Sequence, residues 1–206
     1  MFRAFTRRDI VAWRNGRKRG LTITTDYGRL LISQLEFYWD VHLRPRLDGL
    51  ADDEYLWEPA AGCWSIRPDG SGGFRLDQEP GRPDPAPITT IAWRIFHVAT
   101  AMSTRTSTFF GGGPDADMFD PGHLPAAPGT AAAGLELLDS SYAAWHDAIN
   151  GLDAAALDEP LGWKGSFFAK DPMAALIVHI NREVMHHGGE ICLLRDLYRA
   201  MSKAEP

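Results

Sequence analysis

Apolar residues recur at helical spacing in four stretches of the chain, residues 25–47, 87–110, 130–150 and 172–201. In the first stretch, Leu31, Leu35 and Tyr38 fall three or four positions apart, which is typical of an amphipathic helix. Alternation with a period of two, which indicates a strand, is confined to the surroundings of residues 74–76. Four long helices without a sheet predict an all-α fold, a four-helix bundle.

The connections between these helices are long and rich in proline and glycine, over residues 51–86 and 111–129. Links of that length are commonly either functional or mobile. Residues 1–23 precede the first helical pattern, and we expect them to be a basic, poorly ordered extension. Residues 24–202 are expected to form the bundle.

Composition narrows the class of protein. With 206 residues, 45% of them hydrophobic, the chain is long enough for one domain and too apolar to be disordered. No run approaches the ~18 apolar residues of a membrane helix, so we expect no membrane partner. Two cysteines, Cys63 and Cys192, cannot build a disulfide framework, which favours the cytoplasm.

Charge is distributed unevenly along the chain. Residues 1–20 carry a net charge of +6, and residues 21–206 carry -12. An acidic main body argues against a nucleic-acid partner. For the basic segment, a simple extension is favoured over an arm that binds nucleic acid or a membrane surface.

The fourth helical stretch holds the most informative side chains. At ~100° per residue, one apolar stripe clusters within about 60° of arc on a helical wheel; it consists of Leu176, Ile180, Ile191, Leu194 and Tyr198. His187 falls inside this arc, and Glu183 lies about 20° beyond its edge. A carboxylate that faces a core must be paired, protonated or bound to a metal. Glu183 and His187 are therefore either two ligands of a divalent metal or a metal-free ion pair.

A metal would need a third ligand, for which five of the chain's seven histidines are candidates, His42, His97, His123, His146 and His179. Periodicity leaves His97 on the side of its helix opposite the apolar stripe, at the surface or rim. Gly188 and Gly189, next to His187, lie inside a helix, where glycine costs ~1 kcal/mol relative to alanine. We expect them to admit another backbone or a ligand, or to mark a local distortion.

Three motifs together resemble the DinB-like superfamily, which includes the mycothiol-dependent maleylpyruvate isomerases. Trp57-Glu58-Pro59 followed by Cys63-Trp64-Ser65 is similar to a W-x-P…W-S element between the first two helices. A second-helix segment ends in His97-Val98-Ala99. The third motif is His186-His187-Gly188-Gly189-Glu190, followed by Leu193-Leu194-Arg195. The resemblance extends over about residues 25–200.

This resemblance implies a four-helix bundle that holds a divalent metal with three side chains. Carried onto this chain, the ligands are His97, Glu183 and His187. Glutamate at the second position departs from a three-histidine set and resembles the His/Glu/His set of the mycothiol-dependent branch. His179, His186 and Glu190 are candidates for the shell around these ligands. Gly188 and Glu190 stand where the family often has arginine and glutamine.

Two imidazoles and one carboxylate suit zinc, although nickel, manganese and iron also accept such ligands. The resemblance implies that the metal activates a low-molecular-weight thiol, such as mycothiol, for transfer to a small electrophile or for isomerisation. The alternatives are a non-catalytic metal-binding stress-response bundle, with a homodimer as a candidate assembly, and a metal-dependent hydrolase. Arg182 and Arg195 are candidates to bind a substrate carboxylate, against the simpler interpretation that both are solvated.

Overall fold

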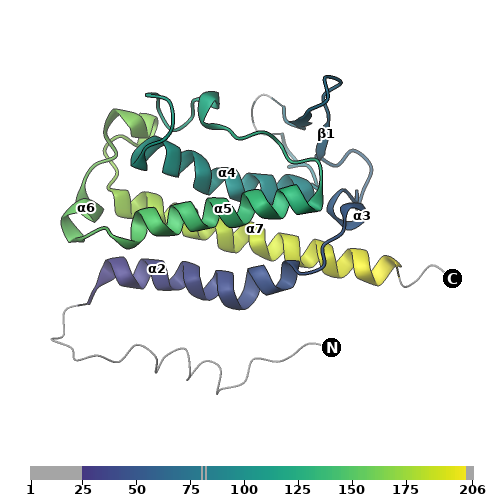
Figure 1. Cartoon of the computed structure of the whole chain (residues 1–206), viewed down its shortest axis with the longest axis horizontal. Helices are drawn as coiled ribbons and strands as arrows, with labels where there is room; N and C mark the ends of the chain where they lie inside the picture. Colours follow the sequence, from purple (N-terminus) through teal and green to yellow (C-terminus); the bar gives the residue numbers. More distant parts are fainter. Residues whose placement is uncertain (1–24, 80, 82, 203–206) are drawn as a thin grey trace, which may run out of the picture.

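Long helices run side by side in the computed structural model, which describes residues 25–79, 81 and 83–202 (Figure 1). They are α2 (Tyr27–Tyr38), α4 (Ile91–Phe110), α5 (Ala131–Asn150) and α7 (Met173–Ser202). α4 lies against both α5 and α7, and α2 contacts the same two helices. The fold is mostly helical, as predicted. The expected extension, residues 1–23, lies outside the described residues.

Short elements close the two ends of this helical body (Figure 1). At one end are α3 (Asp52–Tyr55) and a two-stranded antiparallel sheet, in which β1 (Ile66–Pro68) pairs with β2 (Phe74–Leu76). At the other end is α6 (Ala154–Asp158). The expectation of no sheet is wrong for the link after α3. Strands of three residues are too short for the period-two pattern to reveal both partners.

The first predicted helix is interrupted near its end. The Asp26 side chain caps α2 by accepting a hydrogen bond from the amide of Arg29. After Tyr38 the backbone continues as a π-helical turn, η1 (Trp39–Leu43), and a 3-10 turn, η2 (Arg44–Leu47). Pro45 has no amide hydrogen to donate to the preceding turn, so a regular α-helix cannot continue through it.

The start of α4 is set by contacts with the preceding link. Thr90 caps the helix, so α4 begins at Ile91, four residues later than the pattern predicts. Trp64 donates its amide hydrogen to the carbonyl of Ile88 at 2.9 Å, and Thr90 returns one to the carbonyl of Trp64. Side-chain oxygens of Ser65 and Thr90 lie 3.0 Å apart. The Trp64-Ser65 motif thus anchors the helix that carries His97.

The core lies between the long helices. Its fully buried members include Leu35, Ile95, Met102, Leu138, Trp145, Ile180 and Val184. Gly188 of α7 faces α2, where an added Cβ would lie 2.8 Å from the Tyr38 hydroxyl. The close neighbour that we expected is thus a side chain, not a backbone or a ligand. Gly189 is exposed and has no such contact, since Tyr38 is 3.9 Å from its hypothetical Cβ.

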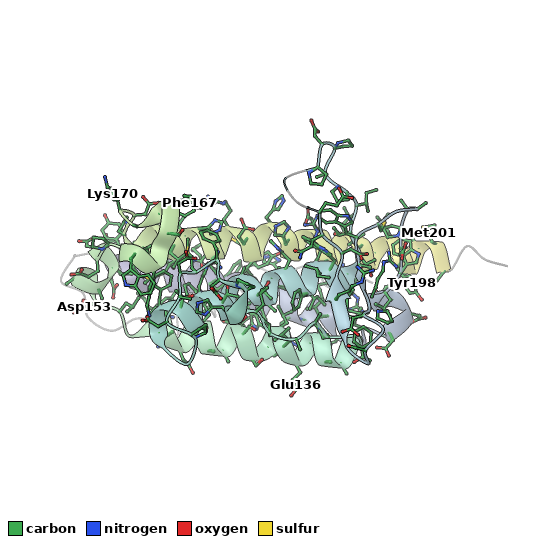
Figure 2. All side chains as sticks on the ribbon, turned by 90° about the horizontal axis from the view of Figure 1, so that it is seen from above. Glu136, Asp153, Phe167, Lys170, Tyr198 and Met201 are labelled. Atoms are coloured by element: carbon green, nitrogen blue, oxygen red, sulfur yellow. The ribbon has the colours of Figure 1, made fainter. Side chains whose placement is uncertain are left out.

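Two further 3-10 turns lie in the links between the long helices, η3 (Pro121–His123) and η4 (Gly162–Phe168). Phe167 and Lys170 lie at one end of the molecule, and Tyr198 and Met201 lie at the opposite end (Figure 2). None of the helices formed by the described residues combines the length and the apolar character needed to cross a membrane.

Candidate metal centre

The three predicted ligands converge between α4 and α7. His187 Nε2 lies 3.2 Å from Glu183 Oε2, and His97 Nε2 lies 3.4 Å from the same oxygen. One donor atom from each of the three side chains lies within 4.8 Å of the other two. The helical wheel predicted that Glu183 and His187 face inward, but it placed His97 at the surface or rim. His97 instead points toward α7, because α4 has neighbours on two sides, α5 and α7.

The His97 ring is held from behind by an aromatic neighbour one turn earlier on α4. Trp93 stacks on it with ring centroids 5.2 Å apart and an interplanar angle of 13°. The indole nitrogen of Trp93 donates to the carbonyl oxygen of Asp77 at 2.9 Å, which fixes the tryptophan. His97 in turn meets the His187 ring edge to face, at 4.6 Å between centroids. These contacts orient Nε2 of His97 toward Glu183.

Glu190 contacts the second ring nitrogen of His187, Nδ1. Its Oε2 lies 2.6 Å from His187 Nδ1, a distance at which a proton must lie between a carboxylate oxygen and a ring nitrogen. Arg94 Nη1 also lies 3.3 Å from Nδ1, but the shorter contact with the Glu190 carboxylate favours the hydrogen on Nδ1 in the neutral ring. Nε2 then presents its lone pair toward Glu183. A carboxylate on the far nitrogen of a metal-binding histidine is a recurring device that fixes the tautomer and makes the ring a better ligand.

Glu190 is itself held by a cation. Nε of Arg94 lies 3.0 Å from Glu190 Oε2, and the arginine side chain is mostly buried. Burial lowers the pKa of the Arg94 guanidinium, and the charge of Glu190 opposes that shift. The chain Arg94–Glu190–His187 thus joins α4 to α7 beside the three candidate ligands.

The protonation states of the cluster suit metal binding. Burial, together with the nearby His187, lowers the pKa of His97 below its usual value, which favours the neutral ring. For Glu183, burial acts to raise the pKa, but the hydrogen bond from His97 and the three nearby histidines outweigh it, so its pKa is lowered. Neutral imidazoles and an ionised carboxylate are the forms that coordinate a divalent cation.

The donor set therefore fits a divalent metal, with two imidazole nitrogens and one carboxylate oxygen converging on one point. Three protein ligands are the number found at catalytic zinc sites, where a fourth position stays open for water or substrate. The ligand side chains are partly exposed, from 13% for His187 to 35% for His97. Solvent and small molecules thus have access to the donors.

Comparison with models of protein families identifies the family of the chain. The model of the DinB superfamily matches residues 34–191, which include all three candidate ligands. The chain belongs to the DinB superfamily. Comparison with curated proteins and with solved structures gives no match.

Within this DinB-superfamily chain, the candidates for the surrounding shell differ in their proximity to the ligands. Glu190 contacts His187 directly. His179 Nδ1 lies 3.7 Å from Glu183 Oε1, on the side away from His187, and also 2.8 Å from a nitrogen of Arg182. His186 is 66% exposed; it lies 3.5 Å from Glu190 and meets the His187 ring edge to face, at 4.7 Å between centroids. His186, His187 and Glu190 also form a second group of donors close enough to share an ion.

The remaining histidines of this DinB-superfamily chain lie outside the cluster. His146 pairs with Glu36 at 3.1 Å between Nε2 and Oε1, and His123 is buried with Nδ1 2.9 Å from Ser107 Oγ. Arg195, a candidate for substrate binding, is completely buried and bound to Glu54 by two contacts of 2.8 Å. The interpretations of Arg195 as a substrate ligand and as a solvated residue are therefore both wrong.

A cavity of about 240 Å³ adjoins the ligands. His97 and Glu183 lie in its wall, with His179 and Ile180 of α7. The remaining lining residues come from α4 and from the link that contains η3, Thr100, Ala101, Thr104, Arg105, Met118, Phe119, Asp120 and Leu124. Sequence reasoning missed Arg94 and Arg105, because a lone arginine in an amphipathic pattern gives no sign of which neighbouring helix it meets.

Proposed function

We propose that the chain is a metal-dependent enzyme whose divalent cation, zinc in the first place, is held by His97, Glu183 and His187. The side-by-side packing of α2, α4, α5 and α7 supports a four-helix bundle of the DinB type as the scaffold. Family membership supports the metal as well, since DinB-like proteins often bind one. Nickel, manganese and iron accept the same donors and are outcomes of the test below.

One observation carries this proposal, the 2.6 Å contact between Glu190 and His187 Nδ1. His187 has a carboxylate oxygen on each ring nitrogen, Glu190 at Nδ1 and Glu183 at Nε2. With the proton of a neutral ring held on Nδ1 by Glu190, the lone pair on Nε2 points toward Glu183, which suits a metal ligand. A doubly protonated ring paired with both carboxylates is the metal-free alternative, and metal analysis distinguishes the two.

We propose thiol-dependent transfer or isomerisation as the reaction class, with a low-molecular-weight thiol and a small electrophile as substrates. A metal at this site supplies the acidity that keeps a thiol as its thiolate. Glu190 would hold the proton on His187 Nδ1, and Trp93 would exclude water from one face of His97. Glu183 at the middle ligand position, as in the mycothiol-dependent branch that the sequence resembles, supports mycothiol as a candidate thiol. The adjoining cavity has room for a small electrophile.

Two other functions compete with this one. A non-catalytic metal-binding protein would use the same three ligands without a substrate in the cavity. A metal-dependent hydrolase would bind water where the thiol is proposed to bind. A set of three protein ligands would leave room for a further ligand on the metal. This and the cavity lined by His97 and Glu183 favour a catalytic function, and the family resemblance favours the thiol.

Metal analysis followed by a conjugation assay separates these functions. We expect purified wild-type protein to contain about one zinc per chain, and to accelerate the reaction of a small thiol with 1-chloro-2,4-dinitrobenzene. Glu183→Gln should lose both metal and activity, whereas Cys63→Ser should keep both, because no cysteine of the chain serves as nucleophile. Metal without any effect of thiol would support the non-catalytic alternative. Full metal content in Glu183→Gln would overturn the ligand assignment.

A further inference from the structure

Arg105 has an unusual position for an arginine of this chain. It lies two turns after His97 on α4, about 12 Å further along the helix axis. Its side chain lines the same cavity as His97 and Glu183. Side chains on a helix lean toward its N-terminus, so the guanidinium leans from its backbone position toward the candidate metal ligands.

The hydrogen bonds of Arg105 leave part of its guanidinium free. Nη1 donates to Thr104 Oγ1 at 2.8 Å and to the carbonyl oxygen of Met118 at 2.9 Å. The Phe119 ring covers it at 5.3 Å. Nε is buried without a hydrogen-bond partner. Among the described residues, none accepts a hydrogen bond from Nη2 either, and no carboxylate forms an ion pair with Arg105.

Two other mostly buried arginines that contact α7 or belong to it are paired with carboxylates, unlike Arg105. Arg94 is paired with Glu190, and Arg195 with Glu54. Burial lowers the pKa of Arg105, and the only acidic side chain that opposes this shift is Glu183. A desolvated guanidinium without an anionic partner is costly, and an anion in the cavity would remove that cost.

The rest of the cavity indicates what the anion is attached to. Met118, Phe119, Leu124 and Ile180 contribute apolar surface to its wall. Asp120 is the only acidic lining residue besides Glu183, and its Oδ1 is occupied by the amide of Gly122 at 2.7 Å. The wall thus combines one arginine, an apolar surface and two of the candidate metal ligands, His97 and Glu183.

We propose that Arg105 binds the carboxylate of an organic acid, the electrophilic substrate, whose apolar body lies on Met118, Phe119 and Leu124 and whose reactive end reaches the metal centre. This rests on the proposed function for the role of the metal. The guanidinium offers paired N–H donors that match a carboxylate. The sequence offered Arg182 and Arg195 for this task; Arg195 is buried against Glu54, and the proposal assigns the task to Arg105 instead.

Binding of a matched acid and amide tests this inference on the full-length protein. The probes are 4-phenylbutanoate and 4-phenylbutanamide, titrated calorimetrically into zinc-loaded and chelator-treated protein. We expect wild type to bind the acid at least about tenfold more tightly than the amide, in both forms, because a hydrogen-bonded charge pair distinguishes the two. Arg105→Met should abolish this preference and Arg105→Lys should keep part of it.

Two controls separate this inference from the metal proposal. Arg75→Met removes an exposed arginine of β2 and should keep the full preference. Zinc affinity should stay within about twofold of wild type in Arg105→Met, since this residue does not touch the ligands. Absence of zinc binding in wild type would overturn the proposed function while the acid preference still reported on Arg105.

Several results would overturn the role of Arg105. One is an acid preference that persists in Arg105→Met but disappears on chelation, which would place the carboxylate at the metal. Another is the absence of acid binding at millimolar concentration. Should Arg105→Met fail to fold, the ¹⁵Nε signal of Arg105 in wild type gives the answer. It must shift on titration with the acid and not with the amide, and an unmoved signal contradicts the proposal.

The thiol is the other source of a carboxylate, and a second probe pair tests it. N-acetylcysteine and N-acetylcysteine amide differ only in the acid group. If the electrophile carries the recognised carboxylate, Arg105→Met changes the ratio of their affinities by less than about twofold. If Arg105→Met abolishes the preference for the acid only in this pair of thiols, Arg105 binds the thiol, and the proposal as stated is overturned.

Discussion

Helix α7 carries two polar clusters with opposite character. Toward its C-terminal end, Arg195 and Glu54 are almost wholly buried, with side-chain exposures of 0% and 5%. Nη1 of Arg195 also donates to the carbonyl oxygens of Arg46 and Asp48, so all its nitrogens have acceptors. This cluster ties α7 to α3 and to the end of η2, near Tyr198 at one end of the molecule (Figure 2).

The cluster in the middle of α7 is more exposed and contains the three candidate ligands. Glu183 Oε2 faces two imidazole nitrogens, and its side chain is 23% exposed beside a cavity. The difference shows how to distinguish a structural ion pair from a candidate site. The first has every donor matched inside the protein, and the second brings potential ligand atoms of three side chains within 4.8 Å of one another.

Breaking the buried pair should have the largest effect on stability. We expect Arg195→Ala to lower the free energy of unfolding by about 3–5 kcal/mol, because it leaves the Glu54 carboxylate buried without a partner. Urea denaturation followed by circular dichroism measures this. Arg199→Ala is the matched control, since Arg199 lies 3.6 Å from the same carboxylate but is 47% exposed, and should cost less than about 1 kcal/mol. Equal losses in the two variants would contradict a structural role specific to Arg195.

Removing a candidate ligand should weaken zinc binding strongly and change the stability of the metal-free protein little. We expect Glu183→Gln to weaken zinc binding by about 100-fold or more. The stability of the metal-free protein should change by less than about 1 kcal/mol, because the side chain is partly exposed. Competition with a chromogenic chelator gives the affinity. A metal-free protein that loses as much stability as Arg195→Ala would indicate that this cluster is structural too.

Glu190→Ala tests the carboxylate behind His187. Loss of such a partner typically weakens metal binding by about 10–100-fold, and we expect a value in that range. His186→Ala is the control, since His186 is exposed and meets only one of the three ligands, His187, through an edge-to-face ring contact. If His186→Ala weakens zinc binding more than His97→Ala does, the ion belongs to the second group of donors, His186, His187 and Glu190.

Alanine substitutions of the two adjacent glycines beside His187 should change the stability less than Arg195→Ala does. Gly189→Ala should raise the free energy of unfolding by up to about 1 kcal/mol, because alanine favours the helix. Gly188→Ala should be less stable than Gly189→Ala by about 1–3 kcal/mol, because its methyl group would overlap the Tyr38 ring. Thermal denaturation of both variants measures the difference, and equal stabilities would show that Tyr38 moves aside freely.

Much of the helical fold could be predicted from sequence, because burial against neighbours imposes a clear period. The predicted and observed ends of α5 and α7 differ by a residue or so. The sequence did not reveal the π-helical turn at Trp39, since it depends on how Pro45 is accommodated. Nor did it reveal the pairing of β1 with β2, which is a contact between two strands of three residues each.

Some residues of the candidate site could likewise be predicted from sequence, and others could not. The spacing of Glu183 and His187 on one helix was enough to predict that they act together. His97 came only from family resemblance, because its position opposite the apolar stripe becomes meaningful only when α7 is placed beside α4. The roles of Arg94, Arg105 and Arg195 depend on which carboxylate, if any, the packing brings to each, and no local pattern encodes that.

Anomalous diffraction from a zinc-loaded crystal tests the central claim most directly. Data collected on either side of the zinc edge locate the ion without assumptions about its ligands. The account predicts one peak at about 2.0–2.2 Å from His97 Nε2, His187 Nε2 and a carboxylate oxygen of Glu183. A peak on the other side of His187, between His186 and Glu190, would contradict it, as would zinc-loaded protein with no peak between α4 and α7.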